Sequence, residues 1–306
     1  MITFTNETMQ EILPFVQKIL LTQEIIFFKV LNPDLSDGYA GSMMLIDEQH
    51  YMHRSYKSWM DLAELLHCKM LTVKESGYPF VTMGFKKLST DSFHAEQKDT
   101  EKYGANSKFN QIHKMEEPAF FYYYNQALDN AKVQNKTHIL NLGINTGDEF
   151  TVIKNKLDTN KYEAMNLVGI DHSKTAIEYA NKVFEEDNVT FHTSDINDIN
   201  SLKLGKFDLL ISIGTLQSPS INFKLFLMSL VQNYLEKDAA IILGFPNSRW
   251  VGGEMIYGAK APNYAMSEQS LLYNDVIFAK KYLQQKKFRV TLTGKQYVFL
   301  TATKIG

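Results

Sequence analysis

The stretch "HILNLGINTGDEF", His138 to Phe150, decides how the rest of the chain is interpreted. It begins with a short apolar run, after which come two glycines, Gly143 and Gly147, with Asn145 midway between them. A buried strand that ends in a tight turn has this pattern, because glycine adopts the positive φ angles that such a turn needs. Asparagine also tolerates positive φ, so Asn145 is compatible with the same turn. The stretch alone predicts a strand and a loop, and it leaves open whether the loop binds a ligand.

Short apolar runs alternate with longer amphipathic stretches through the C-terminal part of the chain. The runs predict strands at 138–142, 165–171, 189–195, 207–213 and 239–245. This alternation is typical of βαβ units and of a parallel sheet. Residues 288–304 differ, because two β-rich runs joined through "TGKQ" predict an antiparallel hairpin. We therefore expect an α/β fold with a Rossmann-like, mostly parallel, seven-stranded sheet that ends in a C-terminal antiparallel hairpin.

Three regions are expected along the chain. Residues 1–88 predict a small N-terminal α+β region that serves substrate binding or assembly. Its mixed pattern indicates helices near 7–21 and 55–70, an apolar run at 24–31 and a hairpin around "ESGY". Residues 89–117 are polar and keep no period, which is typical of a linker or of a lid over a site. Residues 118–306 are expected to form the Rossmann-like domain.

Composition and charge narrow the class of protein. The chain has 306 residues, of which 44% are hydrophobic and 22% are charged, as in an ordinary globular protein. Its net charge of -2 gives no overall positive field for nucleic acid, although a local basic patch would not show in that sum. Cys68 is the single cysteine, which excludes an internal disulfide framework. The N-terminus lacks a basic leader, and no apolar run reaches the ~20 residues that span a bilayer. We expect a cytoplasmic protein without a membrane partner, and homo-oligomer formation stays open.

Residues just after each predicted strand are candidates for a site, because open α/β sheets bind ligands at the carboxyl ends of their strands. A nicotinamide-type G-x-G-x-x-G would need glycines at positions 145 and 148, which the chain lacks. The spacing G-x-G-x-G fits Gly143 and Gly147, with Asn145 in the middle. Asp171 follows the second strand and can accept hydrogen bonds from both hydroxyls of a ribose. Asp195 ends the third strand, where it can accept from an exocyclic amine such as adenine N6.

Taken in order, "LNLGINTG", "VGIDHSKTAIEYANK", "TSDI" and "FDLLISIGTLQ" resemble the class I S-adenosylmethionine-dependent methyltransferases, over roughly residues 118–304. The resemblance implies a methyltransferase with S-adenosylmethionine as its cofactor. In that family the glycine loop packs against the methionine part of the cofactor, the acid after the second strand holds the ribose, and the acid after the third faces the adenine. The cofactor residues that the resemblance implies are Asn141, Gly143, Asn145, Gly147, Asp171, His172, Asp195, Ile196 and Gly214.

The chain departs from the family at two positions of the glycine loop. The family usually carries Asp or Glu where Asn141 stands, and glycine where Asn145 stands. Both departures are expected to affect how tightly the methionine end of the cofactor is bound. An enzyme that uses a modified or decarboxylated cofactor is therefore an open alternative. A non-catalytic adenosyl-binding or RNA-binding module is another.

The acceptor is expected to bind after the fourth and fifth strands. The segment after the fourth strand contains Gln217, but neither the Asn/Asp-Pro-Pro-Tyr box of amino-group methyltransferases nor a cysteine nucleophile for cytosine. The long loop at 246–269 supplies Arg249 as an anion anchor, together with Glu254 and Tyr257. Arg249 fits a salt bridge within the loop equally well. We predict Gln217, Glu254, Tyr257 and Arg249 as catalytic or orienting residues, and no metal site. The near-neutral charge favours a small-molecule acceptor, methylated on O or N, while RNA and protein acceptors stay open.

Overall fold

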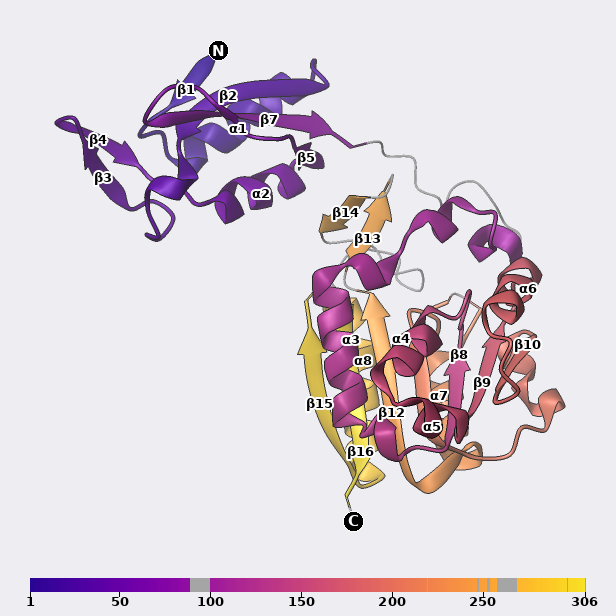
Figure 1. The fold of residues 1–306 in the computed structure, drawn as a ribbon. Coiled ribbons are helices and arrows are strands. Elements are labelled where there is room, and N and C mark those ends of the chain that lie inside the picture. Colours follow the sequence, from indigo (N-terminus) through magenta and orange to yellow (C-terminus); the bar gives the residue numbers. More distant parts are fainter. Residues whose placement is uncertain are drawn as a thin grey trace. The chain divides into compact units, whose positions relative to one another are not determined.

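The computed structural model describes residues 1–88, 100–218, 220–246, 248–251, 254–257, 269–295 and 297–305 (Figure 1). The chain divides into two compact units. The smaller unit contains Met1–Ser92 with Trp250–Tyr257, and the larger contains Phe93–Arg249 with Gly258–Gly306. Each unit has its own sheet and its own hydrophobic core.

The larger unit is built on one seven-stranded sheet of order β10-β9-β8-β11-β12-β16-β15. Its strands are β8 (His138–Leu142), β9 (Asn166–Asp171), β10 (Val189–Thr193), β11 (Phe207–Ile213), β12 (Leu235–Pro246), β15 (Phe288–Gly294) and β16 (Tyr297–Lys304). The first five strands of the order are parallel. β16 runs antiparallel to both β12 and β15. The predicted Rossmann-like α/β fold with a C-terminal antiparallel hairpin is confirmed.

The strand order reverses between β8 and β11. From β8 the chain continues outward through β9 and β10, and it then returns to place β11 on the other side of β8. Leu209 of β11 lies opposite Ile139 of β8 in a parallel register, so the two strands end at the same edge. This edge is the topological switch point at which open α/β sheets bind ligands.

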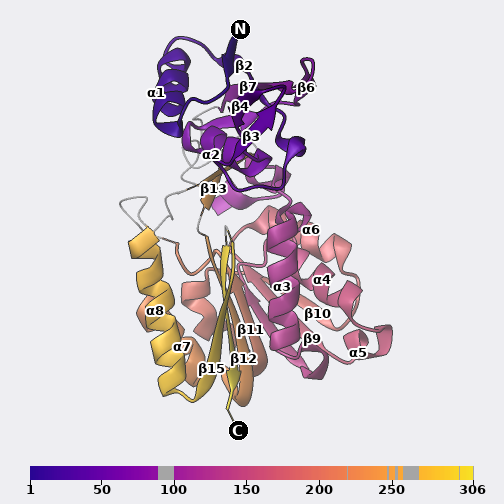
Figure 2. The ribbon, with the colours of Figure 1, turned by 90° about the vertical axis from the view of Figure 1, so that its left-hand side faces the viewer.

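Helices cover both faces of this sheet (Figure 2). They are α3 (Pro118–Asn130), α4 (Asp148–Lys156), α5 (Thr159–Glu163), α6 (Lys174–Val183), α7 (Phe223–Asn233) and α8 (Gln269–Gln285), with short 3-10 helices η5 (Val133–Asn135) and η6 (Ile196–Leu202). Leu210 of β11 shares a core with residues of α7 and α8, whereas Leu209 shares a core with residues of α3 and α4. Successive side chains of a strand point to opposite faces, so one apolar strand supplies both cores. No helix of the described part of the chain is both long and apolar enough to cross a membrane.

Some boundaries in the larger unit differ from the predicted ones. β10 ends at Thr193 instead of residue 195, because Asp195 is already the N-cap of η6. β12 begins at Leu235 instead of residue 239, with an irregularity in its pairing to β11. Part of the segment predicted to be irregular forms three short 3-10 helices, η2 (Thr100–Tyr103), η3 (Lys108–Gln111) and η4 (Lys114–Glu116).

The smaller unit is α+β, as predicted. Its sheet has the order β1-β2-β7-β5, with β6 paired to β7. The strands are β1 (Ile2–Phe4), β2 (Ile25–Leu31), β5 (Cys68–Met70), β6 (Lys74–Glu75) and β7 (Phe80–Lys87). The helices α1 (Met9–Leu20) and α2 (Tyr56–Leu65) share one core with the sheet. Outside this sheet lie η1 (Pro33–Leu35), the hairpin of β3 (Met43–Ile46) and β4 (Gln49–Met52), and a two-stranded sheet of β13 (Ser248–Val251) and β14 (Glu254–Tyr257).

The helix predicted over 55–70 is wrong at its C-terminal end. α2 stops at Leu65, and His67 has a left-handed φ of 53° that no helix continues through. Cys68–Met70 then forms β5, antiparallel to β7. In such a short run the spacing of the apolar residues fits a helix and a strand equally well, so pairing with β7 determines that a strand forms.

Candidate functional site

The loop after β8 is held in a left-handed turn. Gly143, Asn145 and Gly147 have φ angles of 77°, 51° and 97°. These angles are ordinary for glycine and tolerated by asparagine, so the turn persists with Asn145 at its centre. At Gly143 a Cβ atom would lie 1.8 Å from Oγ1 of Thr215, in the segment after β11. Glycine therefore allows the loops at the ends of β8 and β11 to approach each other at the switch point.

Asp171, the last residue of β9, links two loops through its carboxylate. Its side chain is buried, with 5% of its surface exposed. Oδ2 accepts the backbone N–H of Asn145 at 3.0 Å, and Oδ1 accepts that of Ser173 at 2.9 Å. A carboxylate offers about four lone-pair positions, so each oxygen retains acceptor capacity for a further donor. Asp171 thus fixes the glycine loop to the start of α6 and can still bind a ligand.

The charge on Asp171 is only partly compensated. Burial raises the pKa of this carboxyl above its usual value, while the N–H of Ser173 and the neighbouring His172 oppose that rise. His172 is partly exposed, and its Nδ1 lies 3.8 Å from Oδ1 of Asp171. A buried carboxylate that lacks full compensation is stabilised by further hydrogen-bond donors. The hydroxyls of a ribose are donors of this kind.

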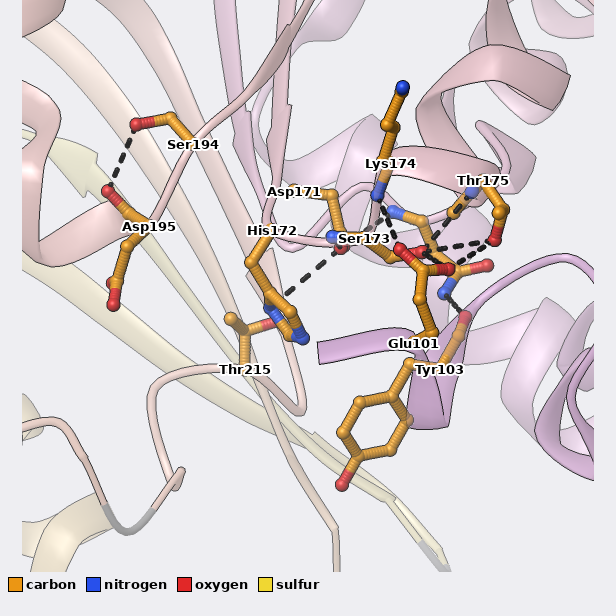
Figure 3. A network of polar contacts seen from close by, with 12 residues as sticks. Glu101, Tyr103, Asp171, His172, Ser173, Lys174, Thr175, Ser194, Asp195 and Thr215 are labelled. Atoms are coloured by element: carbon orange, nitrogen blue, oxygen red, sulfur yellow. Dashed lines mark hydrogen bonds and ion pairs between the residues drawn. The ribbon is translucent and has the colours of Figure 1, made fainter. Parts of the chain in front are cut away.

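A segment far away in the sequence lies against this part of the site. Glu101, in η2, accepts hydrogen bonds from Oγ of Ser173 at 3.0 Å, from the N–H of Lys174 at 2.9 Å and from Oγ1 of Thr175 (Figure 3). The pKa of the Glu101 carboxyl is lower than its usual value, mainly because Thr175 donates a hydrogen bond to it. The carboxylate also sits at the N-terminus of α6, where the helix dipole favours a negative charge.

The same segment also contacts the glycine loop. Nδ2 of Asn145 donates to the backbone carbonyl of Tyr103 at 2.6 Å. The ring of Tyr103 packs edge-on against that of His172, with centroids 6.2 Å apart. The N–H of Ala105 donates to Oγ1 of Thr175 at 3.0 Å. η2 and the residues after it therefore contact the glycine loop through Asn145 and the start of α6 through Thr175.

At the switch point, two buried amide side chains each contain an atom without a hydrogen-bond partner in the described part of the chain. Asn141, in β8, and Gln217, after β11, are each 1% exposed. The atoms without a partner are Nδ2 of Asn141 and Oε1 of Gln217. Leaving a buried donor or acceptor unpaired costs about 1–3 kcal/mol, a cost that a bound ligand removes. Asn141 lies within β8 and Gln217 follows β11, the two strands that meet at the switch point, so this part of the sheet contains one unpaired buried donor and one unpaired buried acceptor.

The remaining predicted cofactor residues lie at neighbouring strand ends. Asp195 follows β10 and is exposed, and its Oδ1 accepts the N–H of Asn197 at 2.9 Å. Ile196, expected beside an adenine ring, is only 7% exposed and belongs to the hydrophobic core. Gly214 has a φ of 72°, and a Cβ there would lie 3.0 Å from the hydroxyl of Tyr297.

The structure does not describe the side chains of three residues that were predicted to bind or orient the acceptor. Arg249 lies in β13, and Glu254 and Tyr257 lie in β14. Their side chains are outside the described part of the structure. Gln217 is the one residue of that predicted set whose side chain is described.

Two acidic residues next to the glycine loop were not predicted as site residues from the sequence. Asp148 and Glu149 open α4, directly after Gly147. Burial raises the pKa of Glu149 to about 8, with the adjacent Asp148 as the second cause, and burial also raises the pKa of Asp148. A helix that begins with acidic residues is ordinary, so the sequence held no signal that these two are desolvated. Glu101 was missed for a different reason, because its segment shows no period.

The comparisons with known proteins identify the family of the larger unit. A family model described as a methyltransferase domain matches residues 133–293, just over half of the chain. No curated protein matches the chain significantly.

Three solved structures illustrate the similarities found. The plantazolicin methyltransferase BpumL in complex with SAH is 14% identical, with a TM-score of 0.49 over 67% of this chain and 94% of that chain. A SAM-dependent methyltransferase from Aquifex aeolicus is 14% identical, with a TM-score of 0.44 over 68% of this chain and 100% of that chain. A fibrillarin/Nop5p complex is 13% identical, with a TM-score of 0.39 over 55% of this chain and 73% of that chain. None of these similarities identifies the acceptor.

Replacing Glu149 by glutamine should change how stability depends on pH. Between its ordinary value near 4.5 and about 8, the folded protein keeps a proton that the unfolded chain has lost. Stability therefore falls as pH rises through this window, by at most about 1.4 kcal/mol per pH unit. We expect Glu149→Gln to raise the melting temperature relative to wild type, by an amount that grows from about pH 5 to about pH 8.

Melting curves of the full chain across this pH range measure the effect. Glu163→Gln, which removes an exposed carboxyl from α5, is the matched control and should follow wild type. Parallel curves for wild type and Glu149→Gln would show that Glu149 is ionised in the folded protein and would contradict its desolvation.

Proposed function

The chain belongs to the family of methyltransferase domains, and on this premise we propose that it transfers a methyl group from S-adenosylmethionine to an O or N atom of an acceptor. The observation that supports the cofactor most is the carboxylate of Asp171, buried at the end of β9 and hydrogen-bonded to the loop after β8. In this position it can accept from both ribose hydroxyls. Asp195 is exposed at the end of the next strand, where it can accept from the adenine amine.

The unpaired amides at the switch point suit the other end of the cofactor. The methionine part of S-adenosylmethionine carries a carboxylate, and Nδ2 of Asn141 is a buried donor without a partner in the described part of the chain. We expect this donor to bind the carboxylate. A decarboxylated cofactor would leave Nδ2 unpaired, so Asn141 favours the complete cofactor although the family usually has an acid there.

Bound S-adenosylmethionine supplies a methyl group made electrophilic by a positively charged sulfur. The task of the protein is then mainly alignment, with a base only where the acceptor atom carries a proton. Oε1 of Gln217 is suited to accept from an N–H or O–H of the acceptor and to orient it, since an amide is not a base. For Glu254, Tyr257 and Arg249 the roles of base, orienting group and anion anchor stay predictions.

Residues 89–117, predicted to be a linker or a lid, are proposed to act as a lid. The hydrogen bonds of Glu101 and Tyr103 to the start of α6 and to Asn145 support this role, because they tie the segment to the edge of the sheet where the cofactor is expected. For residues 1–88 a role in substrate binding or assembly stays a prediction.

Titration calorimetry with S-adenosylmethionine tests the cofactor assignment. We expect wild type to bind, and both Asp171→Ala and Asp195→Ala to bind about 10- to 100-fold more weakly, because each loses hydrogen bonds to a charged group. Asp187→Ala, which removes an exposed carboxylate from a turn, is the matched control and should bind like wild type. Decarboxylated S-adenosylmethionine should bind more weakly than the complete cofactor. Absence of binding to wild type, or undiminished binding to both site variants, would refute the assignment.

Transfer of a tritiated methyl group into fractionated cell extract identifies the acceptor class. We expect label in the small-molecule fraction, in line with a net charge of -2 and with the acceptor held at the switch point. Label in the RNA or protein fraction would replace the small-molecule acceptor by that class. An extract without label in any fraction, despite cofactor binding, would favour a non-catalytic adenosyl-binding module.

A further inference from the structure

The sheet of the smaller unit has one face that its helices leave uncovered. Ile26, Phe28 and Val30 of β2 enter the core shared with α1 and α2, as do Val81 and Met83 of β7. The alternating residues of these strands point to the opposite face. The uncovered part of that face, called the open face below, consists of Thr3, Ile25, Phe27, Lys29, Lys69, Leu71, Lys74, Thr82, Gly84 and Lys86. The next pair along the two central strands, Leu31 and Phe80, lies on the same face but is covered, because Leu31 is 2% exposed and the ring of Phe80 packs against that of Tyr51 in β4.

The strand register arranges the open face in three rows. In the first row Ile25 lies opposite Lys86, which lies opposite Lys69. In the middle row Phe27 lies opposite Gly84. In the third row Lys29 lies opposite Thr82, which lies opposite Lys74. Successive rows are about 6.6 Å apart, since two residues of a strand separate them.

An aromatic ring occupies the middle row. A Cβ atom at Gly84 would lie 2.6 Å from Cε1 of Phe27, so the ring leans across β7 instead of projecting away from the sheet. The ring is 43% exposed. Gly84 therefore allows a flat aromatic surface to lie on the sheet, available for stacking.

The rows on both sides of the ring are basic. Each contains two lysines, one from a central strand and one from an edge strand, and no position of the open face is acidic. The neighbouring Glu24 is paired with Lys87 at 3.3 Å, and Glu75 lies opposite Val81, on the other side of the sheet. Lys69 and Lys86 lie directly opposite each other on neighbouring strands, so the first row places both lysines on the same side of Phe27.

We propose that the open face binds single-stranded nucleic acid. A base stacks on Phe27, and the phosphates on either side of that base contact the two lysine rows. Proteins that bind single strands combine these elements, a stacking ring and a positive track for the backbone. A membrane surface fits less well, because the single exposed ring lies along the sheet and cannot insert among lipids. The inference concerns the smaller unit and is independent of methyl transfer.

Fluorescence anisotropy of the full chain with a labelled oligonucleotide of about 12 uridines tests the proposal. We expect binding that weakens with salt, with log Kd changing by about 0.7 per phosphate contacted for each unit of log salt concentration. Lys29→Ala with Lys86→Ala should lower that slope by about 1.4, because two phosphate contacts are lost. Phe27→Ala should weaken binding about tenfold without changing the slope.

Matched controls separate the face from the rest of the unit. Tyr39→Ala removes an aromatic ring that is 92% exposed but lies outside the open face, and Lys18→Ala removes an exposed lysine of α1. Both should bind like wild type, and circular dichroism should show all variants folded. The proposal is overturned by absence of binding at low salt, by unchanged binding of Phe27→Ala, or by tighter binding to a duplex. It is likewise overturned if the variant with Lys29→Ala and Lys86→Ala binds the oligonucleotide like wild type and loses binding only to anionic phospholipid vesicles.

Discussion

One buried carboxylate holds the candidate site together. Asp171 accepts a backbone N–H from Asn145 and another from Ser173, and so it joins the glycine loop to the start of α6. Burying a charge is costly unless hydrogen bonds compensate it, and burial raises the pKa of Asp171 although two N–H groups donate to its carboxylate. A ligand with two adjacent hydroxyls would complete that compensation. The hydrogen bonds that order the two loops and the proposed contact with a ribose thus involve the same carboxylate.

Around this carboxylate the chain retains several locally unfavourable features. Asn145 has a left-handed φ angle although it is not a glycine, and Gly143 lies against Thr215 with no room for a side chain. Unpaired amide atoms lie nearby, in the buried side chains of Asn141 and Gln217. Features of this kind persist where function requires them and where the surrounding fold is rigid enough to hold them. Here the rigid part is the parallel sheet, whose core residues on both faces are close to fully buried.

Much of this arrangement could be predicted from the sequence. The apolar runs locate the strands because both faces of a parallel sheet are covered, and Asp171 could be predicted because it directly follows such a run. Glu101 could not, because its contacts with Ser173 and Lys174 join positions more than 70 residues apart, and its own segment has no period. The burial of Ile196 in the core also depends on packing that the order of residues does not reveal. The basic charge of the open face could not be predicted from the net charge of -2, because only the strand register brings its lysines together.

Hydrogen–deuterium exchange of the full chain, with and without S-adenosylhomocysteine, tests most directly whether the cofactor binds at the Asn145–Asp171 pair. Binding there predicts slower exchange in peptides that contain residues 143–147, 171–175 and 100–105, and unchanged exchange in β2 and β7 of the smaller unit. Saturation by the ligand with unchanged exchange in 143–147 and 171–175 would contradict the account, because the ligand would then bind without contacting the loops that Asp171 joins.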